Sequence, residues 1–75
     1  MEYKNVSVRA ADGTLVLQDG SADEQRGKMK IKGKLEDGVV LTVGKKYKIT
    51  GEVGLTTKGT YAGSPGAGTF EFKIE

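Results

Sequence analysis

The chain has 75 residues, a net charge of +2, and neither cysteine nor histidine. The lack of cysteine excludes disulfides and thiolate zinc sites, and the lack of histidine removes the usual general base at neutral pH. A chain of this length buries only about 60% of its unfolded surface, so self-association is a remaining route to stability. We expect one domain over 1–75, with no catalytic residue, metal site or cofactor.

Turn signals and alternating apolar residues divide the chain into short extended segments. Asp12-Gly13 and Asp37-Gly38 predict hairpins, because this dipeptide suits a type I′ turn. The segment from Ser21 to Glu24 has capping-box spacing, which predicts at most one helical turn near 21–26. The predicted strands span about 3–10, 14–18, 27–36, 39–43, 46–55, 56–61 and 69–75.

Six or seven short strands separated by turns predict an all-β fold, either a small antiparallel barrel or a sandwich. Because successive side chains of a strand point to opposite faces, the alternation also predicts which residues are buried. The predicted core consists of Val6, Val8, Leu15, Leu17, Met29, Ile31, Leu35, Leu41, Val43, Tyr47, Ile49, Val53, Phe70, Phe72 and Ile74.

Residues 59–68 include four glycines and a proline, which predicts a flexible loop. Binding residues are often carried by loops, so this segment is a candidate contact surface for a protein partner. Its candidate partner-binding residues are Tyr61, Ser64 and Pro65.

Lysine occupies every second position from residue 28 to residue 34, which predicts a strand with one wholly cationic face. We call Lys28, Lys30, Lys32 and Lys34 the lysine stripe. Residues 26–48 carry eight basic and two acidic side chains, so this segment is +6 and the remainder is −4. Such a stripe protects a sheet edge and keeps a small β-protein soluble, or it binds an anionic partner. For single-stranded nucleic acid, the candidate binding residues are Lys28, Lys30, Lys32, Lys34, Lys46 and Lys48.

The run from Leu41 to Val53, LTVGKKYKITGEV, contains the pattern V-G-[KDE]-x-[YV]-x-[IV]-x-G-x-V. In this it resembles the central strand of small β-rich proteins of bacteriophages. The resemblance implies an accessory or virion-associated protein, and it assigns no functional residue.

The sequence therefore predicts a non-enzymatic interaction module. In the first interpretation it binds a protein partner or copies of itself through a sheet edge and the loop at 59–68. The alternative is a single-stranded nucleic-acid-binding protein that uses the lysine stripe. No apolar run in the chain is long enough to span a membrane, so we expect no membrane association. We expect a cytoplasmic location, which means the host cytoplasm or the virion for a phage-encoded chain.

Overall fold

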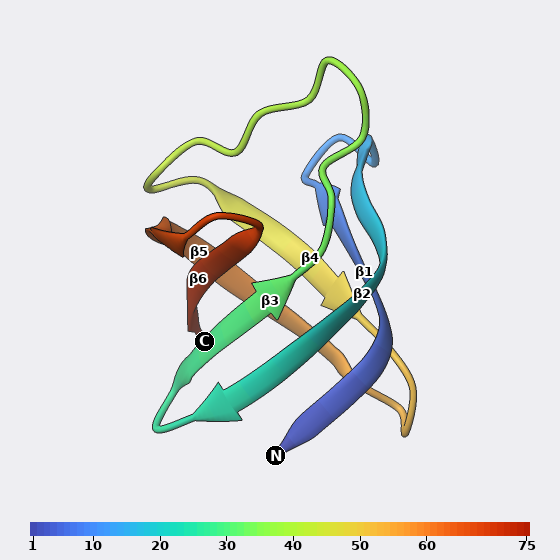
Figure 1. Ribbon diagram of the computed structural model, residues 1–75, viewed down its shortest axis with the longest axis vertical. Helices are drawn as coiled ribbons and strands as arrows, with labels where there is room; N and C mark the ends of the chain where they lie inside the picture. Colours follow the sequence, from blue (N-terminus) through green and yellow to red (C-terminus); the bar gives the residue numbers. More distant parts are fainter.

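The computed structural model describes residues 1–75, which form six antiparallel β-strands and no helix (Figure 1). Alternation of apolar and polar residues explains the strands, as in KMKIK, where Met29 and Ile31 are buried and the lysines are exposed. The expectation of an all-β fold is confirmed, and the sheet closes into a barrel. The strands are β1 (Glu2–Ala10), β2 (Leu15–Gln25), β3 (Lys28–Lys32), β4 (Lys46–Thr50), β5 (Thr56–Gly66) and β6 (Thr69–Ile74).

The barrel is built from two meanders of three strands each, β1–β2–β3 and β4–β5–β6. The outer strands of the two meanders pair with each other, β1 with β4 and β3 with β6. The order around the barrel is therefore β1-β2-β3-β6-β5-β4. Residues 33–45 connect the meanders and arch over the top of the barrel in Figure 1. β4 thus returns to lie beside β1, which is a Greek-key arrangement.

Closure gives every strand a hydrogen-bonded neighbour on both sides. β3, which carries most of the lysine stripe, pairs with β2 along one side and with β6 along the other. A closed barrel has no free sheet edge. One interpretation is therefore wrong: the stripe does not protect a sheet edge, because β3 is paired on both sides.

The core is one cluster of inward-facing side chains from the strands and the turn before β5. Phe72 on β6 is buried near its centre, with its ring 5.9 Å from that of Tyr47 and 5.4 Å from that of Tyr61, measured between centroids. Val43 and Val53 are 65% and 84% exposed, so their predicted place in the core is wrong. Leu15 is wrong as well, because it stands opposite the exposed Arg9 and does not join the core cluster. The buried core also holds four residues that the predicted core list lacked, Val16, Ala22, Leu55 and Tyr61.

Residues 39–43 form part of the connection between the meanders and not a strand. Both sides of β3 are occupied by β2 and β6, so a strand at 39–43 has no hydrogen-bonding partner beside it. The Asp37-Gly38 pair does make a turn, closed by the Val39 amide donating to the Glu36 carbonyl at 3.1 Å. Val39 and Leu41 pack against the rim of the core without entering a sheet.

The predicted helical turn near 21–26 is instead the second half of β2. The pairing runs from Ser21 opposite Lys32 to Gln25 opposite Lys28, and the tight turn at Arg26 and Gly27 joins the strands. Both turn residues have positive φ, as a type I′ hairpin requires. A ladder of cross-strand hydrogen bonds therefore outweighs the local capping signal.

The expected flexible loop at 59–68 is largely the end of β5, and only residues 67 and 68 form the turn into β6. Gly59 is buried in this strand. A Cβ at this position would lie only 3.1 Å from both Phe72 Cβ and Ile74 Cδ1, so a larger residue would crowd β6. This glycine serves close packing against β6 and not chain flexibility. Register shifts at Gly63 and Gly66 accommodate the remaining glycines within the ladder.

Replacing Ile31 by alanine tests this core. Ile31 is fully buried between Ala22 on β2 and Phe70 on β6. We expect Ile31→Ala to lower the free energy of unfolding by about 2–5 kcal/mol, because the lost burial and the cavity add. Thermal denaturation followed by circular dichroism measures this, and an unchanged melting temperature would contradict the placement of β3.

Candidate functional site

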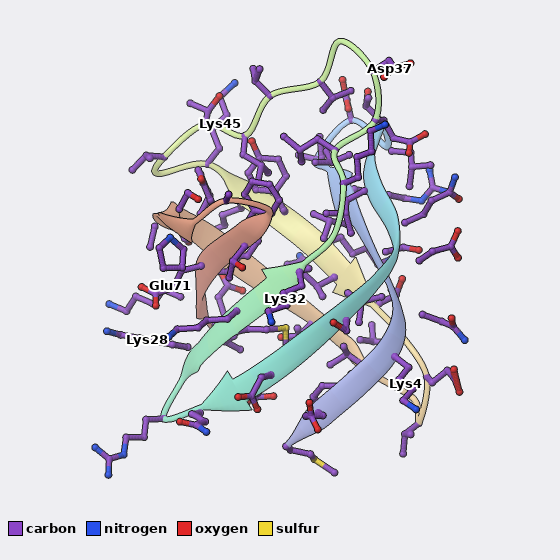
Figure 2. The ribbon with its side chains drawn as sticks, viewed as in Figure 1. Lys4, Lys28, Lys32, Asp37, Lys45 and Glu71 are labelled. Atoms are coloured by element: carbon purple, nitrogen blue, oxygen red, sulfur yellow. The ribbon has the colours of Figure 1, made fainter.

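The lysine stripe lies on the outside of the barrel among acidic neighbours. Lys30 stands directly opposite Asp23 on β2 and Glu71 on β6. Figure 2 shows Glu71 on the same side of the barrel as Lys28. Lys34 lies beyond the end of β3, in a surface depression that Asp19 and Asp37 also line. Carboxylates therefore interrupt the positive potential of the stripe.

The six candidate nucleic-acid-binding lysines do not form one surface. Those on β3 are separated from Lys46 and Lys48 on β4 by the two intervening strands β5 and β6. Lys28 is connected to Lys46 by a single outward row, through Lys73 on β6 and Thr60 on β5. Lys46 and Lys48 also join a larger group of donors, on the outer face of β1, β4 and β5.

That outer face holds a row of three cations. Arg9 on β1 stands directly opposite Lys48 on β4, which stands directly opposite Lys58 on β5. All three side chains are exposed, and the inward row beside them is Val8, Ile49 and Thr57. Because directly opposite residues share a face of the sheet, the three cations lie side by side.

Hydroxyl groups flank the row of cations on both sides. The outward row on one side of the cations consists of Ser7, Thr50 and Thr56. The outward row on the other side consists of Lys46 and Thr60, which stand opposite each other. β4 and β5 contain no acidic residue, in contrast to β2. We call this surface the cation–hydroxyl face; its residues are Ser7, Arg9, Lys46, Lys48, Thr50, Thr56, Lys58 and Thr60.

One carboxylate borders the cation–hydroxyl face. The Glu75 amide donates to the Lys58 carbonyl at 3.2 Å, and the Glu75 carboxylate forms an ion pair with Lys46. The Lys46 ammonium, through this hydrogen bond and its charge, lowers the pKa of Glu75 below its usual value of 4.5, and Lys58 adds to the effect. The face thus already holds one anionic group, with both partners exposed to solvent.

The candidate partner-binding residues at the β5–β6 hairpin differ in their exposure. Tyr61 is only 7% exposed and packs on Phe72, so its ring is not presented to a partner. Ser64 is exposed, and its hydroxyl lies 2.7 Å from the carbonyl oxygens of Gly66 and Thr69. Pro65 is exposed beside it. These residues do not converge on one binding surface.

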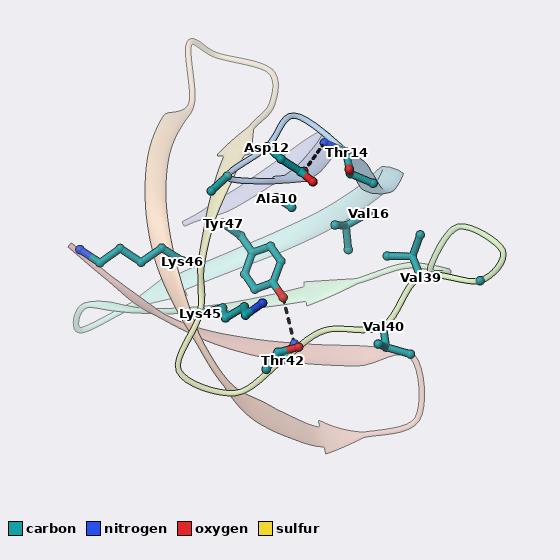
Figure 3. A pocket seen from close by; sticks show the side chains of 12 residues that line it. Ala10, Asp12, Thr14, Val16, Val39, Val40, Thr42, Lys45, Lys46 and Tyr47 are labelled. Carbon is teal, nitrogen blue, oxygen red and sulfur yellow. Dashed lines mark hydrogen bonds between the residues drawn. The ribbon is translucent and has the colours of Figure 1, made fainter.

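An open groove of about 610 Å³ lies at one end of the barrel, between the β1–β2 turn and the connection that precedes β4 (Figure 3). Tyr47 forms its floor, and the Thr42 amide donates to the Tyr47 hydroxyl at 2.9 Å. Asp12 lies on the rim, where hydrogen bonds from Thr14 lower the pKa of its carboxyl below 3.8. Val40 lines the groove and is 77% exposed. We call this the end groove.

No family model matches the chain, and no curated protein or solved structure shows significant similarity to it. The structure contains no helix that could cross a membrane. No three acidic side chains lie close enough together to hold a metal ion. The candidate sites therefore depend on geometry and charge alone.

The two charged surfaces predict opposite effects on stability. Like charges that face each other directly destabilise a sheet, whereas opposite charges stabilise it by about 0.2–1 kcal/mol. We expect Lys48→Gln to raise the melting temperature at low salt, because it relieves repulsion by Arg9 and Lys58. We expect Lys30→Gln to lower it, because Lys30 faces Asp23 and Glu71.

Thermal denaturation at about 10 mM and 1 M salt separates these effects from packing, because the Debye length falls from about 30 Å to about 3 Å. Both shifts should shrink at high salt. A lower melting temperature for Lys48→Gln at low salt would contradict the assigned register of β1, β4 and β5.

Proposed function

We propose that the protein is a non-enzymatic binding module for single-stranded nucleic acid, and that its binding surface is the cation–hydroxyl face. One observation carries the proposal: Arg9, Lys48 and Lys58 stand directly opposite one another on three neighbouring strands, with no carboxylate between them. Such a row costs folding free energy in the free protein, and an anionic ligand turns this repulsion into attraction.

The surrounding chemistry supports a phosphate-bearing ligand. Arginine, lysine, serine and threonine side chains are among the usual donors to phosphate oxygens in protein–nucleic acid complexes. All eight residues of the cation–hydroxyl face belong to these four types. The lysine stripe is the weaker candidate, because Asp23 and Glu71 flank Lys30 within it. A cytoplasmic or virion location, which the resemblance to bacteriophage proteins implies, would bring the protein into contact with nucleic acid.

A second candidate function is the binding of a protein partner, or of a second copy of the chain, at the end groove. The observation in its favour is the exposure of Val40 (77%) on the connection between the meanders. Val40 lines the groove together with Val39 and the ring of Tyr47. A contact of this kind would bury apolar surface that the barrel leaves open to water.

Two double variants with the same change in net charge test the leading proposal. We expect Lys48→Gln/Lys58→Gln to weaken binding of a labelled single-stranded oligonucleotide roughly tenfold at 50 mM salt. The slope of log K against log[salt] should become shallower by about 1.4, since each lost phosphate contact contributes about 0.7. Fluorescence anisotropy measures both quantities.

The matched control is Lys30→Gln/Lys32→Gln on β3, which should leave the affinity within about threefold, because released counterions at these sites contribute little. Equal losses in the two variants would mean that net charge, and not the cation–hydroxyl face, governs binding. Absence of binding by the unmodified protein at 50 mM salt would refute the proposal and favour the end groove.

The ion pair between Lys46 and Glu75 predicts a change in the opposite direction. A ligand phosphate must compete with the Glu75 carboxylate for Lys46. We expect Glu75→Gln to strengthen oligonucleotide binding roughly two- to fivefold. A change of this size corresponds to the free energy that an exposed ion pair contributes. Glu71→Gln makes the same charge change beside the lysine stripe, and a gain as large as that of Glu75→Gln would contradict the assigned surface.

A further inference from the structure

The cation–hydroxyl face carries no aromatic ring. Three of the five rings in the chain, those of Tyr47, Tyr61 and Phe72, are buried in the core. Phe70 stands opposite the buried Ile31 and packs on the same core. Single-strand binders that hold bases do so by stacking them on exposed rings.

The fifth ring lies away from the face as well. Tyr3 on β1 stands opposite the buried Ala22 and packs against the core. Its hydroxyl lies 3.5 Å from the Glu24 carboxylate, in a region where Glu2 and Asp23 also stand opposite each other. A negatively charged chain would be repelled there, so this ring does not extend the cation–hydroxyl face.

The face also lacks the side chains that typically read adenine and cytosine. Its arginine and lysines can contact guanine, but they donate equally to phosphate oxygens. Asparagine and glutamine, which pair with adenine, and acidic residues, which accept from cytosine, are absent from all eight positions. Glu75, at the border, is paired with Lys46. What remains is a set of four cations and four hydroxyls, each able to donate to an anionic oxygen.

These donors form a regular grid on three strands. Outward residues two apart along a strand are about 6.5 Å apart, and opposite residues have Cβ atoms about 5 Å apart. Each of the outward positions in the three rows holds a cation or a hydroxyl. Successive phosphates of an extended chain would therefore meet a donor wherever the chain lies on this face.

We propose that the cation–hydroxyl face binds the phosphate chain alone, with Ser7, Thr50, Thr56 and Thr60 donating hydrogen bonds between the cations. This inference rests on the proposed function and specifies its ligand class: a linear polyphosphate chain, with or without bases. Bases of a bound nucleic acid point away from the barrel into solvent and add nothing to the affinity.

Three probes of known composition test this: a labelled thymidine 20-mer, an abasic 20-mer with the same backbone, and inorganic polyphosphate as a competitor. We expect the abasic strand to bind within about threefold of the thymidine strand, and polyphosphate to displace both. Loss of even one stacked base would cost roughly fivefold or more.

The outcomes separate the two proposals. If the thymidine strand binds and the abasic strand binds at least tenfold more weakly, the protein holds bases and this inference is wrong, while the proposed function stands. If neither strand binds at 50 mM salt, the proposed function itself fails. Displacement of the thymidine strand by polyphosphate supports the inference, and failure to displace it contradicts the inference.

A second experiment isolates the hydroxyls. Thr50→Val/Thr56→Val removes two donors while keeping shape, strand preference and charge. We expect several-fold weaker binding of the abasic strand with an unchanged salt slope, because no counterion release is lost. Thr69→Val, which removes an outward hydroxyl opposite Lys32 on the lysine stripe, is the control and should bind as the unmodified protein does. Unchanged affinity in the double variant would overturn the role of the hydroxyls.

Discussion

Pairing between the two meanders is the constraint on which the rest of the structure depends. The β1–β4 and β3–β6 ladders close the sheet, bury one face of every strand and give each strand a paired neighbour on both sides. Closure also decides which side chains become outward neighbours. Arg9 and Lys48 are far apart in the sequence, and they stand opposite each other only because β4 returns beside β1.

Positive and negative side chains are distributed unequally around the barrel. On the side of β2, β3 and β6, Lys30 faces Asp23 and Glu71, and these opposite charges stabilise the sheet, although Lys28 faces Lys73. On the side of β1, β4 and β5, cations face cations. Beneath these cations Val8 and Ile49 are buried in the core cluster, and their burial stabilises the barrel against the repulsion.

The sequence predicted the all-β class, the outward lysines of β3 and most of the core, because these follow from period-two alternation within a strand. It did not predict the extent of β5. The glycines of residues 59–68 were interpreted as a flexible loop, whereas Gly59 serves close packing against β6. The cation–hydroxyl face was also missed. Lys58 is the single basic residue of β5 and Arg9 is one of two in β1, so only the register of β1, β4 and β5 brings them to Lys48.

Chemical-shift mapping by NMR, with an abasic oligonucleotide added to the ¹⁵N-labelled protein at low salt, tests the central claim most directly. We predict that the shifted amides belong to the outer face of β1, β4 and β5, with Arg9, Lys48 and Lys58 among them. The amides of Lys30 and Lys32 on β3 should stay unchanged. Shifts centred on β3, or on the end groove around Val40, would contradict the account.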